Sequence, residues 1–187
     1  MTQLKGFFAL AAFMVSILSC GQQFFATPDG LLDANDSTKT YIVIPCEGKT
    51  AKELYDNAIK YIQQNYKNPE EVIKGQVEAE YLSYETFSPS VISFKRSGGR
   101  PTYNLTYRTG MHFKDGKVRY EIQNVEMTTD DGYNLYFSGN PLTTVAIYNH
   151  KGELKYDEAK TKVENYFNTV IMSLSQYLNG VKKVDEW

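Results

Sequence analysis

Residues 103–128 read YNLTYRTGMHFKDGKVRYEIQNVEMT, and this stretch decides the fold. It contains two strand-like runs on either side of Asp115-Gly116. Asp-Gly between such runs is a strong signal for a β-hairpin, because a type I′ turn needs positive φ at both central residues. The turn predicts three cross-strand pairs, which are Phe113 with Val118, Met111 with Tyr120, and Thr109 with Ile122.

The two faces of this hairpin differ in polarity, because successive side chains of a strand point to opposite faces. The apolar face takes Tyr103, Leu105, Tyr107, Thr109, Met111 and Phe113. The polar face takes Asn104, Thr106, Arg108, Gly110 and His112.

The alternation of the second strand changes phase between Ile122 and Val125. One extra residue near Gln123-Asn124 restores the pattern and pairs Tyr107 with Val125 and Leu105 with Met127. We therefore predict a β-bulge at this point. The alternative is a strand that ends at Asn124.

Further elements lie on both sides of the hairpin. Residues 41–44 are predicted to form a short strand, and Thr50 with Glu53 forms a capping box that starts a helix. A second helix is expected over residues 156–178, from its apolar stripe and from Asn179-Gly180 as its C-cap. Other runs with the pattern of strands are residues 72–84, 91–96 and 133–137.

Together these elements predict an α+β fold in the order β-α-β-β-β-β-α. Two helices that each carry one apolar stripe fit one face of a curved antiparallel sheet. We expect a single domain over residues 40–180, followed by a tail over 181–187. Residues 130–153 are an extension whose structure the pattern leaves open.

The amino terminus has the pattern of a secretory signal. Lys5 precedes an apolar run that is too short to span a membrane as a helix. The end of this run, Ile17-Leu18-Ser19-Cys20, resembles the lipobox of Gram-negative lipoproteins, in which the cysteine is lipidated and becomes the mature amino terminus. We therefore expect a signal peptide over residues 1–19, lipidation of Cys20 and a membrane anchor.

The residues after Cys20 indicate the compartment. Gly21 stands where Asp would retain a lipoprotein in the inner membrane, so we expect the outer membrane, with the protein facing the periplasm. Residues 20–39 lack a sustained period and are predicted to form a lipid-anchored tether. Cys46 follows an apolar run and is expected to be a small buried residue.

The chain resembles a bacterial family of domains of unknown function. The resemblance rests on residues 41–44, on Thr50-Ala51-Lys52-Glu53-Leu54-Tyr55 and on Asp115-Gly116-Lys117-Val118-Arg119-Tyr120 with the residues that follow, and it covers roughly residues 40–130. The family is described as having a TATA-binding-protein-like fold, and many members are exported lipoproteins. The resemblance implies this fold and export, but it carries over no functional residues.

The residues indicate binding rather than catalysis. The chain has only two histidines and shows no spacing typical of a zinc site, a phosphate-binding loop or a nucleophile elbow, so we expect no enzyme, no metal and no cofactor. The best catalytic pair would be His112 and Glu121. The formal net charge of −2 and the expected export argue against nucleic acid as a partner.

We expect the polar face of the sheet to bind an unknown envelope protein or glycan. The residues predicted to form this face are Tyr84, Lys95, Arg108, His112, Arg119 and Glu121. The alternative is a carrier that holds a small apolar ligand between helix and sheet, since the chain has fifteen tyrosines and ten phenylalanines. The competing interpretation of these rings is that they fill the core.

Overall fold

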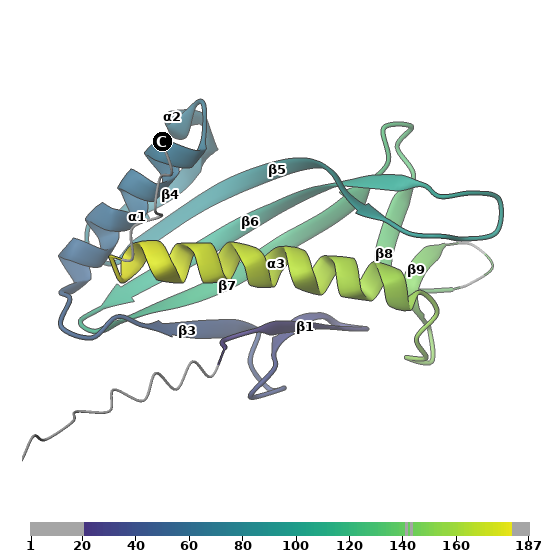
Figure 1. Ribbon diagram of the computed structural model, residues 1–187, viewed down its shortest axis with the longest axis horizontal. Coiled ribbons are helices and arrows are strands. Elements are labelled where there is room, and N and C mark those ends of the chain that lie inside the picture. The colour runs from purple at the N-terminus through teal and green to yellow at the C-terminus, as the bar shows by residue number, and fades with distance from the viewer. Residues whose placement is uncertain (1–20, 141, 143, 181–187) are drawn as a thin grey trace, which may run out of the picture.

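The computed structural model describes residues 21–140, 142 and 144–180. It has an α+β architecture, with a mostly antiparallel sheet and helices on one of its faces (Figure 1). The helices are α1 (Ala51–Asn65), α2 (Pro69–Val72) and α3 (Asp157–Leu178). The strands of the sheet are β3 (Tyr41–Pro45), β4 (Ile73–Val77), β5 (Tyr81–Ser93), β6 (Thr102–Lys114), β7 (Lys117–Thr128), β8 (Asn134–Gly139) and β9 (Val145–Asn149).

The long strands β5, β6 and β7 form the centre of this sheet, whose order is β4-β5-β6-β7-β8-β9. β7 has two neighbours on its other edge. β3 pairs with its beginning, from Lys117 to Glu121, and β8 pairs with its end, at Met127 and Thr128. The first strand of the predicted order therefore lies next to the central hairpin.

The central hairpin is confirmed, and its turn differs from the prediction. The three predicted pairs and the pair of Leu105 with Met127 are all present. The register shifts where Asn124 has a φ of 51°, which confirms the bulge. Tyr107 lies at this shift, so its predicted pair with Val125 is not formed. Asp115 does not have a positive φ, and only Gly116 does, so the turn is not of type I′.

The start of α1 is bonded to this turn. The Asp115 carboxylate accepts a hydrogen bond from the Ala51 amide at 2.8 Å, and the Gly116 amide donates to the Lys49 carbonyl. The predicted capping box of Thr50 and Glu53 is present as well. These contacts satisfy amide groups at the helix start that have no partner within the helix.

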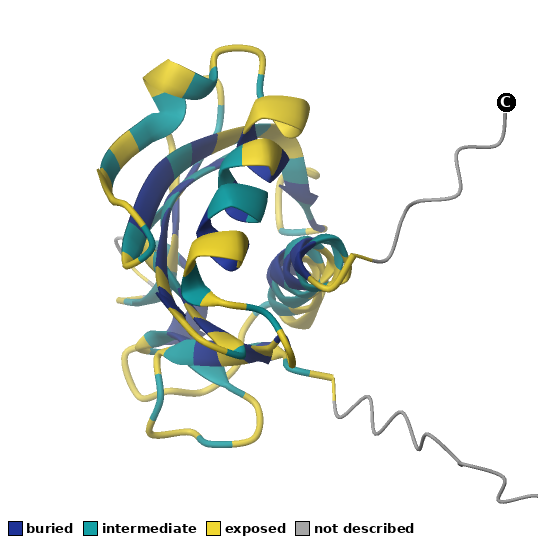
Figure 2. Cartoon of the chain, turned by 90° about the vertical axis from the view of Figure 1, so that its left-hand side faces the viewer, coloured by how far each residue is buried: buried dark blue, intermediate teal, exposed yellow. Residues whose placement is uncertain are grey.

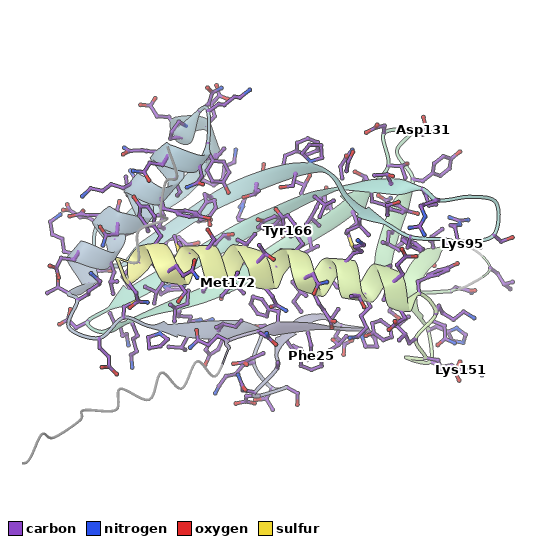
Figure 3. All side chains as sticks on the ribbon, viewed as in Figure 1. Phe25, Lys95, Asp131, Lys151, Tyr166 and Met172 are labelled. Atoms are coloured by element: carbon purple, nitrogen blue, oxygen red, sulfur yellow. The ribbon has the colours of Figure 1, made fainter. Side chains whose placement is uncertain are left out.

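Aromatic rings fill the space between the sheet and the helices. The buried residues of α1 and α3 face the sheet, and their exposed residues face outward (Figure 2). The Tyr107 ring contacts the rings of Tyr166 and Phe167 on α3, with centroids 5.9 and 5.0 Å away. Tyr166 extends from α3 toward the sheet (Figure 3), and its hydroxyl lies 2.7 Å from that of Ser88.

The predicted strand over residues 72–84 is instead a hairpin of β4 and β5. The turn between them lies at residues 78–80, where Ala79 adopts a φ of 61°. β-Hairpin turns use such left-handed positions, but Ala is an uncommon residue there, so the sequence carries no turn signal. The predicted strand over 91–96 is confirmed only as far as Ser93, where it forms the end of β5 after an irregularity at Ser90.

The predicted tether is a packed hairpin over much of its length. Strands β1 (Phe24–Thr27) and β2 (Gly30–Asp33) pair with each other and lie against α3. Phe24 and Ala26 are each 1% exposed. The Asn168 side chain bonds both the amide and the carbonyl of Phe24, and Glu164 accepts from the Ala26 amide at 2.9 Å. The folded domain therefore begins well before residue 40.

The extension after residue 130 completes the sheet with a parallel pair. β8 and β9 pair in parallel, although only a short segment separates Gly139 from Val145. Parallel neighbours usually need a connection of about a dozen residues or more. The chain returns directly over Gly139, where a Cβ atom would lie 2.2 Å from the Thr144 hydroxyl, so this position requires glycine.

The predicted signal peptide, Cys20 and the predicted tail over 181–187 lie outside the described residues. Within the described part of the chain, no helix is long and apolar enough to cross a membrane. Cys46 is fully buried, as predicted, and burial raises the pKa of its thiol to about 11.

Candidate binding face of the sheet

The face of the sheet that points away from the helices, here called the outer face, carries the candidate site. Side chains from β3, β5, β6 and β7 meet there, because register places them opposite one another. Tyr81 pairs with His112, His112 pairs with Arg119, and Tyr41 pairs with Glu121.

Glu121 lies at the centre of this face. Its carboxylate accepts hydrogen bonds from Arg119 at 2.8 Å and from Gln123 at 3.0 Å, and it lies 3.6 Å from the His112 Nε2 atom. It lies over Gly110, where an added Cβ would come within 2.9 Å of the carboxylate. The absence of a side chain at Gly110 therefore lets Glu121 lie close to the sheet, with 13% of its side chain exposed.

Two tyrosines flank this charged centre. The Arg119 guanidinium stacks on the Tyr41 ring, 4.1 Å from its centroid, which is a cation–π contact. On the other side, the centroids of the Tyr81 and His112 rings are 4.8 Å apart. The result is a continuous row of ring, cation, carboxylate and ring across four strands.

Arg108 forms a second polar group farther along β6. Its guanidinium lies 3.4 Å from Glu85, and Glu85 also lies 3.8 Å from the Lys74 ammonium. Its Nε atom is buried, without a hydrogen-bond partner among the described residues. Arg108 therefore has hydrogen-bonding capacity that its neighbours do not use.

Large apolar side chains are exposed around these polar groups. Phe87 is 63% exposed, Val77 52% and Val43 38%. Register places each of them on the outer face, opposite Thr106, Tyr81 and Arg119 respectively. These three side chains come from different strands, β3, β4 and β5, and they add apolar contact area to the outer face.

Alternation placed four of the six residues on the correct face of the sheet, because Arg108, His112, Arg119 and Glu121 all lie on the outer face. Tyr84 does not. It is 1% exposed, its ring packs against that of Tyr66 on the helical side, and burial raises its pKa well above the usual value. The turn at Ala79 shifts the phase of β5, so Tyr84 pairs with the inward-facing Thr109.

Lys95 also lies away from the outer-face cluster, beyond the end of β5 (Figure 3). Its amide donates to Glu158 on α3 at 3.0 Å. The prediction missed Tyr41 and Tyr81. Tyr41 shares a strand face with Val43, so the alternation of residues 41–44 contained the signal for it.

The titratable side chains of the described residues are dispersed. In the ranges that the structure describes, no three His, Cys, Asp or Glu side chains gather as metal ligands. The two histidines are separate, since His112 lies on β6 and His150 follows β9. The His112–Glu121 pair is partly exposed and bonded into the surface network.

Comparison with known proteins supports the fold. Residues 41–128 match the model of the domain of unknown function DUF4468 with TBP-like fold. A crystal structure of a DUF4468 family protein from Bacteroides ovatus is similar, with a TM-score of 0.51 and 13% identity, covering 77% of this chain and 86% of that one.

A TBP-like protein from Parabacteroides distasonis has a TM-score of 0.49 and 7% identity, covering 76% of this chain and 92% of that one. No curated protein matches the sequence.

Proposed function

We propose a function from the outer face, since residues 41–128 match the model of a domain of unknown function with TBP-like fold. The chain is an exported lipoprotein, anchored through Cys20 to the outer membrane and facing the periplasm. Its outer face binds an envelope protein without catalysing a reaction. This proposal assigns the function to the row of Tyr41, Arg119, Glu121, His112 and Tyr81.

The observation that carries the proposal is the composition of the outer face. Tyrosine and arginine are enriched at the centres of protein interfaces, where they supply large contact areas with few rotatable bonds. Arg119 is held on Tyr41 and by Glu121, so binding would cost little side-chain entropy. Phe87 adds an exposed apolar ring farther along β5 on the same face, opposite Thr106.

A protein partner fits this face better than a glycan or a small molecule. Two grooves of the described residues lie elsewhere, one between α3 and β1 and one beside α1. Sites for small molecules are concave. A sheet face with separated aromatic and charged groups presents the broad contact area that protein partners use.

Neither a nucleic acid nor an apolar ligand is proposed. Arg108, Arg119 and His112 on the outer face are accompanied by Glu85, Glu121 and Glu126, and the chain carries a formal net charge of −2. A phosphate backbone favours a net positive surface. An apolar cavity would need free space between α3 and the sheet, but the rings of Tyr107, Tyr166 and Phe167 pack against one another there.

Affinity capture from an envelope extract tests the binding proposal. The wild-type chain is compared with a double variant, Phe87→Ala with Arg119→Ala, and with Lys162→Ala on the exposed side of α3 as the control. We expect the wild type and the control to enrich the same protein, and the double variant to enrich it at least about tenfold less.

Two results of this capture would contradict the proposal. One is equal enrichment by the double variant, which would place the site on another surface. The other is a ligand that survives protease treatment of the extract and is lost after glycosidase treatment, which would identify a glycan.

Detergent phase separation tests the anchor. The wild type is expected in the detergent phase, because several acyl chains on one cysteine anchor a protein stably. Cys20→Ser should move it to the aqueous phase while the circular dichroism spectrum of the domain stays unchanged. A Cys20→Ser protein that remains in the detergent phase would refute the anchor.

A further inference from the structure

A groove runs between α3 and the beginning of the described chain. Its volume is about 970 Å³, and its lining includes Gly21, Phe25, Pro45, Asn165, Thr169 and Met172. Phe25 on β1 and Met172 on α3 border this space (Figure 3). The groove is open along one side of the helical layer, on the opposite side of the molecule from the outer face.

The second half of α3, which lines much of this groove, lacks charge, whereas the first half contributes Lys160 and Glu164, whose ammonium and carboxylate lie 2.6 Å apart. From Asn165 to Gly180 the sequence contains no Asp, Glu, Lys or Arg. The exposed positions of this stretch within the helix are Asn165, Thr169, Met172 and Gln176, and Met172 is 57% exposed. Helices that face water normally carry charged residues on that face. The neutrality of this half of α3 therefore needs a physical reason.

Residues 22–24, at the beginning of the described chain, are held in place by hydrogen bonds next to this groove. Gln22, the residue after Gly21, donates from its side chain to the Val43 carbonyl, and the Gln23 carbonyl accepts from the Ala34 amide at 2.8 Å. Phe24 is bonded to α3 through both of its backbone polar groups. Gly21 alone separates Gln22 from Cys20 in the sequence, and an extended residue spans at most about 3.6 Å, so an anchor at Cys20 would be tied closely to Gln22.

We propose that the uncharged side of α3 and the adjoining groove lie against the lipid surface of the membrane. This inference rests on the proposed anchor at Cys20, because acyl chains so close to Gln22 leave the domain little freedom to move away from the bilayer. The neutral polar side chains of α3, with Met172 and Phe25, suit the headgroup region because they carry no charge that has to lose its hydration. Lys160 and Glu164, which also line the groove, are paired with each other. The outer face then points away from the membrane, toward the periplasm.

Lipid-borne quenching tests this orientation. The full lipoprotein is reconstituted into phosphatidylcholine vesicles that contain a spin-labelled lipid. A fluorescent maleimide is attached at Met172→Cys, and at Gln123→Cys on the outer face as the matched control. Acylation blocks Cys20, and Cys46 is fully buried with its pKa raised to about 11, so neutral-pH labelling is confined to the introduced thiol.

We expect the label at Met172→Cys to be quenched severalfold more strongly than the label at Gln123→Cys. Equal quenching, or stronger quenching at Gln123→Cys, would overturn the orientation. Acylation of Cys20 is tested separately, by flotation of the protein with the vesicles and by its intact mass. A protein that fails to float and carries no acyl mass overturns the anchor and, with it, the orientation. A protein that floats with equal quenching overturns the orientation alone.

Discussion

The hairpin of β1 and β2 yields a quantitative prediction about a segment whose sequence has the character of a tether. Phe24 is 1% exposed, and its ring centroid lies 6.5 Å from that of Tyr120 on β7. Replacement of a buried Phe by Ala typically costs about 3–5 kcal/mol, from lost burial and from the cavity that remains. For a domain of this size, that loss lowers Tm by about 6–20 °C. We therefore expect Phe24→Ala to be strongly destabilising.

Phe25→Ala is the matched control, since it removes the same side chain from the next residue. Phe25 points into the open groove and is only partly buried, so its loss should cost less than about 1 kcal/mol. Both variants are made in a chain that begins at Gly21, and urea unfolding is followed by circular dichroism. If both variants unfold at the wild-type urea concentration, the hairpin does not pack on α3 in solution and our interpretation of this segment is wrong.

Four further changes test other parts of the structure. Ala79→Gly should raise the free energy of unfolding by about 1 kcal/mol, because glycine adopts the left-handed φ without a steric penalty; an unchanged urea midpoint would argue against this turn. Asp115→Ala should lower it by about 1 kcal/mol through loss of the bond to the Ala51 amide, and Asp115→Asn should recover part of that loss. Gly110→Ala should change stability by less than about 1 kcal/mol but displace the carboxylate above it, so partner capture should fall while urea unfolding stays near that of the wild type. Burial raises the folded pKa of the Cys46 thiol from 9.0 to about 11, so its contribution to the free energy of unfolding is present below pH 9 and is lost as the pH rises from 9 to 11, where the unfolded thiol ionises first. Urea unfolding of the wild type should therefore show a fall in stability over this pH range that is absent in Cys46→Ala.

The sequence predicted the features that depend on neighbouring residues or on simple alternation. The central hairpin is the clearest example, because its pairs follow from the Asp115-Gly116 turn and one bulge near Asn124. The capping box at Thr50 is another, since both partners lie within one helical turn. Four of the six expected residues on the outer face follow from the same alternation.

The features that escaped prediction depend on distant contacts or on residues in uncommon conformations. β1 packs because Asn168 and Glu164, far away in the chain, bond its backbone, and its own sequence carries no sign of these partners. Tyr84 was placed on the wrong face because Ala79 adopts a conformation usual for glycine or asparagine. The short parallel connection after β8 depends on Gly139 lying under Thr144, which no local pattern indicates.

The contact between β1 and α3 also determines when the fold can be completed. The first strand of the domain is bonded to its last helix, and β3 adds to the sheet only after β7 exists. Contacts between residues so distant in sequence make folding slow, since the closure of long loops precedes any gain from packing. A chain that emerges from its amino terminus cannot bury Phe24 on α3 until α3 has been synthesised. The topology thus favours an unfolded chain during synthesis, which is the state that the proposed export across a membrane requires.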